Sequence, residues 1–242
     1  RGRLALFSLS LPGIEVKYSL DISDPVLLVA GGRRPDPAWL GRVLPIFGRR
    51  WCADSGLIPC LEAGYIPDRL IGDADSTPPD LWRSASEAGA LVTRHPQDKD
   101  LTDLQLALQT ISKEIPGATV VVTGCWGGRF DHMYSNVFSA VWAREIGTRV
   151  LAFVDDRECM FLLEGEGTLD ISADSAEAVL SLLPITFECR GVCIKNTKWE
   201  LEDSLLSQMY PYSISNRTES GLASVKVQKG ILGVYYGWLR EW

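Results

Sequence analysis

Long apolar runs, abundant histidine and an excess of positive charge are all missing from this chain of 242 residues. No stretch approaches the roughly 18 consecutive apolar residues that a membrane-spanning helix needs. Zinc binding is disfavoured, because His95 and His132 are the two histidines of the chain. The net charge of −7 at pH 7 argues against nonspecific binding to nucleic acid or to an anionic membrane surface. An anionic nucleotide is not excluded, because a divalent cation can reverse the sign of the local field.

Closely spaced cysteine pairs are missing as well. The six cysteines, at positions 52, 60, 125, 159, 189 and 193, form neither a CxxC pair nor a tight disulfide framework. Reduced thiols in a cytoplasmic protein are the simplest interpretation. The basic start Arg1-Gly2-Arg3, followed by the largely apolar residues 4–11, faintly resembles a signal peptide but lacks a small-residue cleavage site. We expect a strand there instead.

Short apolar runs alternate with amphipathic stretches through the first two thirds of the chain. Strands are predicted at 26–30, at 51–53, in the stretches that end at Gly72, Thr93 and Gly124, and at 150–154. Apolar residues at three- and four-residue steps predict a helix over 101–115, and a second helix runs from Met133 until the pattern fades before Gly147. Alternating strands and helices predict an α/β fold with a mostly parallel sheet.

The pattern changes after about residue 156. Short apolar stretches are broken by evenly spaced turns that contain glycine, and little helical periodicity is left. This texture favours an antiparallel β-sandwich. We therefore predict two domains: an α/β domain over residues 1–156 and a C-terminal antiparallel β-sandwich over residues 157–242.

Two carboxylates follow one of the predicted strands. Asp73 and Asp75 come directly after the apolar pair Leu70-Ile71, where open α/β sheets place their ligands. Residues two apart in an extended segment point to the same face, so these carboxylates would repel unless a cation lies between them. Mg²⁺ fits, because it prefers oxygen ligands and usually keeps substrate phosphates in its shell. The alternative is an Asp-rich turn in which Ser76 caps the next helix.

A second acidic cluster precedes the helix predicted over 101–115. Asp100 is a natural N-cap, and we place Asp103 at the third helical position, where the helix dipole favours a carboxylate. Capping explains Asp100 fully. Both carboxylates could also complete the metal site or orient a hydroxyl group. The two roles are compatible, since a cap fixes the backbone that carries the ligand.

A glycine-rich loop, Gly124 to Arg129, follows another predicted strand. It is neither a Walker A loop, because no Gly-Lys-Ser/Thr follows, nor a GxGxxG loop. Glycines before a helix start still let backbone N–H groups approach phosphates, and Arg129 adds a cationic fork. The alternatives are a plain turn with an Arg129–Asp131 ion pair, or a nucleophilic Cys125 with His132 as its partner.

Together these residues resemble the thiamine pyrophosphokinase family. The resemblance rests on Ala53-Asp54-x-Gly56, Pro67-Asp68 leading to Gly72-Asp73-x-Asp75-Ser76, Asp100-x-Thr102-Asp103, Gly124-x-x-Gly127-Gly128-Arg129-x-Asp131-His132 and Ser213-x-Ser215-Asn216, in this order. It implies a nucleotide-binding α/β domain followed by a β-sandwich, and a homodimer with active sites between the subunits. The implied reaction is ATP + thiamine giving thiamine diphosphate + AMP. Ser55 and His95 depart from the glycine and the aromatic residue usual in the family.

The resemblance also implies roles for individual residues. The catalytic candidates are Asp73, Asp75, Asp100, Asp103, Arg129 and Asp131. Mg²⁺ would be held by Asp73, Asp75 and Asp103. ATP would be bound by Gly32, Asp54, Gly56, Asp73, Ser76, Thr102, Gly127, Gly128, Arg129 and His132. Thiamine would be bound by Trp199, Ser213, Ser215 and Asn216.

Within these sets, Asp100 would orient or deprotonate the substrate hydroxyl, and Asp131 would fix Arg129 or a metal-bound water. For Trp199 the alternative is an aromatic residue of the core. Two other functions stay open at this point: a pyrophosphokinase acting on a hydroxymethylpterin, and a sensor that binds ATP and Mg²⁺ without turnover.

Overall fold

A computed structural model of the chain describes residues 6–22, 24–73, 77–96, 100–175 and 178–238. The chain divides into two compact units. The α/β unit holds residues 24–156, and the β unit combines residues 1–23 with residues 157–242. The division after residue 156 falls where the sequence pattern changes. The N-terminal segment, however, joins the β unit, so the predicted α/β domain starting at residue 1 is corrected to one starting at Asp24.

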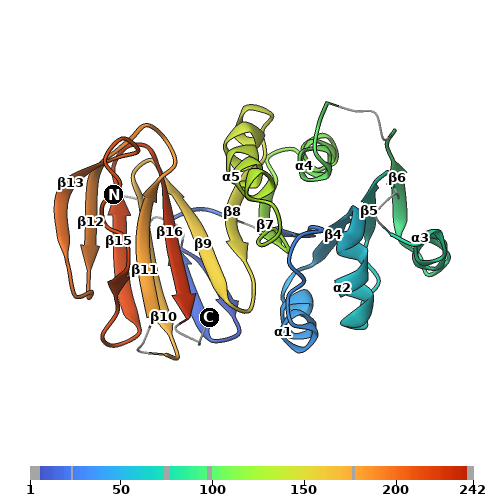
Figure 1. The fold of residues 1–242 in the computed structure, drawn as a ribbon, viewed down its shortest axis with the longest axis horizontal. Coiled ribbons are helices and arrows are strands. Elements are labelled where there is room, and N and C mark those ends of the chain that lie inside the picture. Colours follow the sequence, from blue (N-terminus) through green and yellow to red (C-terminus); the bar gives the residue numbers. More distant parts are fainter. Residues whose placement is uncertain (1–5, 23, 74–76, 97–99, 176–177, 239–242) are drawn as a thin grey trace. The chain divides into compact units, whose positions relative to one another are not determined.

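The α/β unit is built on a parallel sheet (Figure 1). Its strands follow the order β8-β7-β3-β4-β5-β6. They are β3 (Val26–Val29), β4 (Arg49–Ala53), β5 (Arg69–Gly72), β6 (Leu91–Arg94), β7 (Thr119–Thr123) and β8 (Arg149–Val154). The central strands are buried on both faces, which is why their sequences are continuous apolar runs.

Helices cover both faces of this sheet. Helices α4 and α5 contact each other on one face, while α1 and α2 contact each other on the opposite face (Figure 1). Among the described residues, no helix is both long and apolar enough to cross a membrane. The helical segments are α1 (Pro37–Val43), η1 (Leu44–Ile46), η2 (Asp54–Gly56), α2 (Leu57–Glu62), α3 (Pro79–Glu87), α4 (Asp103–Glu114) and α5 (Phe130–Glu145).

Helix α4 begins differently from the prediction. Its N-cap is Thr102, not Asp100: the Thr102 hydroxyl accepts a hydrogen bond from the Gln105 backbone N–H at 3.2 Å. In return, the Gln105 side chain accepts a hydrogen bond from the Thr102 backbone N–H at 2.9 Å. This capping box satisfies two amide groups that the helix itself cannot pair. Asp103 is therefore the first helical residue rather than the third, and Asp100 lies outside the cap.

Helix α5 packs through small side chains. Its buried residues are Ser139, Ala140 and Ala143, whereas the larger apolar residues of the helix are half-buried or exposed. Phe130 and Tyr134 are 75% and 57% exposed, and the Tyr134 ring lies 4.6 Å from that of Phe138. These three aromatic residues are spaced four apart and share one face of the helix. We call them the α5 aromatic row.

All strand pairings among the described residues of the β unit are antiparallel. One set of strands has the order β1-β2-β10-β15-β12-β13, and the other pairs as β14-β11-β16-β9. The strands are β1 (Phe7–Leu11), β2 (Ile14–Tyr18), β9 (Glu158–Glu164), β10 (Gly167–Ala173), β11 (Ala178–Pro184), β12 (Glu188–Lys195), β13 (Leu201–Ser207), β14 (Asn216–Arg217), β15 (Leu222–Val227) and β16 (Ile231–Trp238).

The N-terminal hairpin belongs to the β unit because it extends one of these sheets. Strand β2 pairs with β10, with Val16 opposite Ile171. Alternate hairpin residues are buried, including Leu9, Val16 and Tyr18. Burial of this apolar face is what attaches the hairpin to a unit whose other residues begin at Arg157.

Candidate active site

The loops after β3 and β7 meet where the order of the parallel sheet reverses. Strand β3 lies between β4 and β7, and open α/β sheets bind ligands at such a point, outside the carboxyl ends of the strands. The Gly32 N–H donates to the Gly124 carbonyl oxygen at 2.6 Å, and the Arg33 N–H donates to the Trp126 carbonyl oxygen at 2.5 Å. The two loops therefore form one backbone wall.

Glycine is required where these loops touch. A Cβ atom on Gly32 would lie 2.7 Å from the Gly124 carbonyl oxygen, and one on Gly124 would lie 2.4 Å from the Ala30 carbonyl oxygen. Gly124 and Gly127 also have φ values of 67° and 73°, which residues with a side chain rarely adopt. The glycines thus allow contact between the loops and keep backbone N–H groups accessible to a ligand.

A cavity of about 490 Å³ opens beside these loops. The structure brings together around it eight of the residues predicted for ATP binding or catalysis. They come from the loops after β3, β4 and β7 and from the starts of α4 and α5, and are Gly32, Asp54, Thr102, Asp103, Gly127, Gly128, Arg129 and His132. We call it the switch-point cavity.

Asp54 is buried and packs against the end of β5, next to Asp73. Asp54 is only 4% exposed, with a φ of 45°. Gly72 packs against it, because a Cβ atom there would lie 3.1 Å from the Asp54 Cα. Asp73 directly follows Gly72 at the end of β5, so it lies beside the Asp54 loop without lining the cavity. Asp75 and Ser76 lie outside the described residues.

The cavity wall supplies oxygen ligands suited to Mg²⁺. Among the described residues, no three His, Cys, Asp or Glu side chains gather as a ready metal site. Asp103 nevertheless lines the cavity, Asp73 follows the end of β5, and carboxylate oxygen is a ligand that Mg²⁺ prefers. This donor set fits an ion that takes one or two protein carboxylates and completes its shell with water and phosphate oxygens.

Besides Asp73, the predicted residues Asp100, Asp131 and Gly56 lie outside the lining that the structure describes. Asp100 is exposed and precedes the Thr102 cap. Gly56 supports the site from behind, since a Cβ atom on it would lie 2.1 Å from the Val29 carbonyl oxygen. Its role is therefore to let the loop that carries Asp54 pack against β3.

Arg129 is held by Asp131 at the start of α5. Its Nε and Nη2 atoms donate to the two carboxylate oxygens at 3.1 and 2.5 Å. This hydrogen-bonded pair raises the pKa of Arg129 and lowers the pKa of Asp131. The ion pair that we gave as the alternative is thus present, and Arg129 also lines the cavity. Pairing with Asp131 fixes the guanidinium beside the glycine loop.

Asn136 lines the cavity without having been predicted. Its Nδ2 donates to the Cys125 carbonyl oxygen at 2.9 Å, which ties α5 to the glycine loop. It lies four residues after His132, and this one-turn spacing is the signal that could have identified it. Cys125 itself is 2% exposed, and a thiol buried in this way is poorly placed to attack a substrate as a nucleophile.

A second pocket, of about 420 Å³, lies in the β unit. It contains all four residues predicted for thiamine, together with Leu201, Tyr212 and Ile214, which were missed because their apolar pattern resembles that of any strand or turn. Trp199 is 55% exposed, so the alternative of a core aromatic residue is wrong. We call this the Trp199 pocket; its predicted residues are Trp199, Ser213, Ser215 and Asn216.

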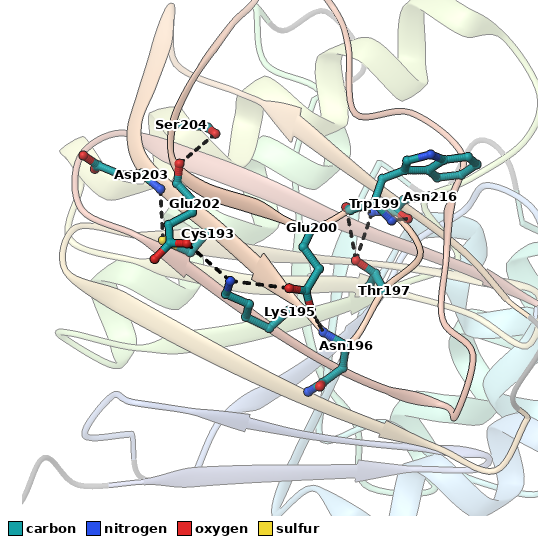
Figure 2. A network of polar contacts seen from close by, with 10 residues as sticks. All are labelled: Cys193, Lys195, Asn196, Thr197, Trp199, Glu200, Glu202, Asp203, Ser204 and Asn216. Atoms are coloured by element: carbon teal, nitrogen blue, oxygen red, sulfur yellow. Dashed lines mark hydrogen bonds and ion pairs between the residues drawn. The ribbon is translucent and has the colours of Figure 1, made fainter.

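Asn216 fixes the position of Trp199 (Figure 2). Its Oδ1 accepts hydrogen bonds from the backbone N–H groups of Trp199 at 3.1 Å and Arg217 at 2.8 Å. Its Nδ2 donates to the Thr197 hydroxyl at 3.1 Å and to the Trp199 carbonyl oxygen at 2.7 Å. All four hydrogen-bonding positions of the amide are therefore occupied, and the residue is 3% exposed. Asn216 shapes the pocket through Trp199.

The two serines lie on a loop with an unusual backbone. Ser213 and Ser215 have φ values of 69° and 59°, a conformation that is costly for residues with a side chain and is common at binding sites. The loop is held by two hydrogen bonds of 2.9 Å: Leu182 N–H donates to the Ser213 carbonyl oxygen, and Ser215 N–H donates to the Ser181 hydroxyl.

Two family models match the chain in the same order as the two sites. The catalytic domain of thiamin pyrophosphokinase matches residues 47–152, and the vitamin B1 binding domain of thiamin pyrophosphokinase matches residues 166–232. The first match includes the loops after β4 and β7, and the second includes the whole Trp199 pocket.

Curated relatives and solved structures agree with these matches. The chain is 26% identical over 179 residues to thiamine pyrophosphokinase of Bacillus subtilis (strain 168), covering 74% of this chain and 82% of the relative. It is 29% identical over 192 residues to thiamine pyrophosphokinase 1 of Oryza sativa subsp. japonica, covering 70% and 72%.

The crystal structure of the Bacillus subtilis thiamine pyrophosphokinase matches with a TM-score of 0.73 at 23% identity, over 88% of this chain and 99% of that one. Thiamin pyrophosphokinase from Candida albicans matches with a TM-score of 0.72 at 18% identity, over 89% of both chains. These likenesses show a shared fold. With two family models in sequence and named relatives over most of its length, the chain belongs to the thiamine pyrophosphokinase family.

Proposed function

We propose that this chain transfers the pyrophosphoryl group of ATP to the primary alcohol of thiamine, giving thiamine diphosphate and AMP. The hydroxyl oxygen forms a bond to the β-phosphorus, and the bond from that phosphorus to the oxygen bridging to the α-phosphate breaks. The hydroxyl proton passes to a carboxylate. The observation that carries this proposal is the switch-point cavity, which combines carboxylates, glycine loops and Arg129 at one sheet edge.

The residues of this cavity suit a nucleotide triphosphate. Backbone N–H groups at Gly127 and Gly128 and the Arg129 guanidinium would bind phosphate oxygens, and Asp54 would face the ribose. Thr102 and His132 complete the proposed contacts. Asp73, Asp75 and Asp103 would hold Mg²⁺, which when bound neutralises charge on the phosphate oxygens. The barrier to this transfer comes mainly from positioning the reactants and from the charge on the phosphates. A fixed wall of donors and cations would lower that barrier.

Asp100 is the proposed residue that orients or deprotonates the thiamine hydroxyl. It lies two residues before the Thr102 cap and beyond the cavity lining. This position suits the acceptor alcohol rather than ATP, because the attacking oxygen must approach the β-phosphorus from the side opposite the leaving AMP. Capping does not compete with this role, since Thr102 performs it.

The Trp199 pocket is the proposed thiamine site. Thiamine is a flat, cationic heterocycle, and an exposed tryptophan face can attract it by stacking and by cation–π interaction. Ser213 and Ser215 would supply hydroxyl groups to the pyrimidine, while Asn216 would hold Trp199. We also infer that the two antiparallel sheets of the β unit form the predicted sandwich. Supporting this, Leu169 and Val225 of one sheet and Leu180 and Leu232 of the other are all fully buried.

We propose a homodimer with active sites between subunits. The switch-point cavity and the Trp199 pocket belong to different units, so one site must combine two units of the same chain or of two chains. The exposed residues of the α5 aromatic row, Phe130 and Tyr134, support the second arrangement, because a partner would cover their apolar surface. We place the enzyme in the cytoplasm on the basis of its cysteine spacing.

The test is to incubate the protein with ATP, Mg²⁺ and thiamine and to identify the nucleotide product. The proposal expects AMP and thiamine diphosphate in equal amounts, and no AMP when thiamine is omitted. Formation of ADP would contradict pyrophosphoryl transfer. Turnover of a hydroxymethylpterin in place of thiamine would support the related pyrophosphokinase, and ATP binding without any product would indicate a sensor.

A further inference from the structure

Asp155, which directly follows β8, is a buried carboxylate. The residue is 0% exposed, although it does not line the switch-point cavity that the structure describes. Burial of a charge is costly unless a partner of opposite sign compensates it. Its presence at the carboxyl end of a buried strand therefore needs a reason.

The compensating charge comes from Arg33, in the loop after β3. Its Nε and Nη2 atoms both donate to Asp155 Oδ2, at 3.0 and 2.5 Å. The Arg33 side chain is 23% exposed and the Asp155 side chain 1%. The ion pair joins segments 122 residues apart in the chain and is shielded from water on the carboxylate side.

Arg33 is also attached to the glycine loop. Its backbone N–H donates to the Trp126 carbonyl oxygen at 2.5 Å. A Cβ atom on Gly127 would lie 2.8 Å from the Arg33 Cβ, so the arginine stem packs directly against that glycine. The Trp126 ring in turn lies 5.6 Å from the ring of Phe153 on β8. Strand β8 thus holds the loop through an ion pair and through an aromatic contact.

We infer that Asp155 is a positioning residue for ATP, acting through Arg33 to hold the two glycine loops in the geometry that receives phosphate. The inference rests on the proposed role of these loops. Without the Asp155 carboxylate, the Arg33 side chain is no longer held in one orientation. The loop segments at Gly32 and Gly127 then lose the side chain that packs against them. Misplacement of phosphate donors weakens ATP binding, whereas the Trp199 pocket in the β unit keeps its own contacts.

The experiment compares Asp155→Asn, Arg33→Met and the double variant with the parent protein. Affinity is measured for the α,β-methylene analogue of ATP with Mg²⁺, because its bridging carbon blocks the transfer. Each single variant should weaken this affinity and raise the KM for ATP by about ten-fold or more, with the KM for thiamine changed by less than about two-fold. The double variant should bind the analogue no more weakly than the single variant with the lower affinity, because the two residues act as one unit.

The matched control is Glu114→Gln, which breaks the Arg69–Glu114 ion pair of the same unit at the far end of α4. It should lower the thermal unfolding midpoint yet leave analogue affinity at the parent value. Should Asp155→Asn fail to fold, Arg33→Lys replaces it, since lysine keeps the charge but gives up the two-atom contact. That variant should show the same selective rise in the KM for ATP.

Analogue affinity within about two-fold of the parent in the folded Asp155 and Arg33 variants would overturn the inference. Equal rises in both KM values would also overturn it, because they would indicate a general structural effect. A parent protein that fails to bind the analogue would instead overturn the proposed function, and the inference with it.

Discussion

Replacement of Asn216 by alanine tests the structural account of the Trp199 pocket most sharply. The change removes four hydrogen bonds, two to the backbone of Trp199 and one each to Thr197 and Arg217. At a net value of roughly 0.5–1.5 kcal/mol each, their loss should lower the free energy of unfolding by about 2–6 kcal/mol. Water entering the emptied site would keep the loss toward the lower end, because the pocket is open beside Trp199.

The functional consequence should be confined to thiamine. Trp199 would no longer be held in the pocket wall, so we expect the KM for thiamine to rise by about ten-fold and the KM for ATP to stay near the parent value. Asn216→Asp is the informative partner variant. It keeps the acceptor for the Trp199 and Arg217 N–H groups but sets a carboxylate oxygen against the Trp199 carbonyl, so an intermediate effect is expected.

A double-variant cycle with Trp199→Ala separates positioning from direct contact. If Asn216 acts through Trp199, adding Asn216→Ala to Trp199→Ala should change the KM for thiamine little further. Steady-state kinetics with urea unfolding of each variant provide both measurements. Fully additive effects on the KM would refute the positioning role and would make Asn216 a direct ligand of the substrate.

Three further predictions address the proposed catalytic residues and assembly. Asp73→Asn should reduce kcat by at least about 10²-fold with folding intact. Near-normal turnover at saturating Mg²⁺ would contradict the metal-binding role and would support the alternative of an acidic turn. Asp100→Ser should change the free energy of unfolding by less than about 0.5 kcal/mol, whereas Thr102→Ala should lower it by about 1 kcal/mol because Thr102 is the cap. Turnover should nevertheless collapse in Asp100→Ser. A fully active Asp100→Ser variant would contradict the proposed role of Asp100. Mixing Asp73→Asn chains with Asn216→Ala chains should restore part of the activity, since one of two shared sites would be intact, and no recovery despite subunit exchange would argue against a site between chains.

Much of the α/β unit could be predicted from local patterns. Each buried strand is recognisable in the sequence as a continuous apolar run, because a parallel sheet covered by helices has no polar face. The acidic and glycine-rich loops after these strands could be predicted for a related reason, because ligands bind where parallel strands end. The predicted strands at 26–30 and 150–154 correspond to β3 and β8 for this reason.

Helix details were harder, because several residues can perform the same local task. Asp100 and Thr102 are both good caps, and the choice of Thr102 follows from the reciprocal bond with Gln105. In α5, the large apolar side chains indicated a helix but not its buried face. Helix packing instead uses Ser139, Ala140 and Ala143, and it leaves Phe130 and Tyr134 exposed.

Contacts between distant segments could not be predicted from sequence. The pairing of the N-terminal hairpin with β10, the Arg33–Asp155 ion pair and the hold of Asn216 on Trp199 join residues that no periodicity relates. Residue type and spacing describe which surfaces a segment can offer, because they act over a few neighbouring positions. Which surfaces meet depends on burial of the whole chain, so the residues that hold the two pockets in shape were assigned by the folded arrangement.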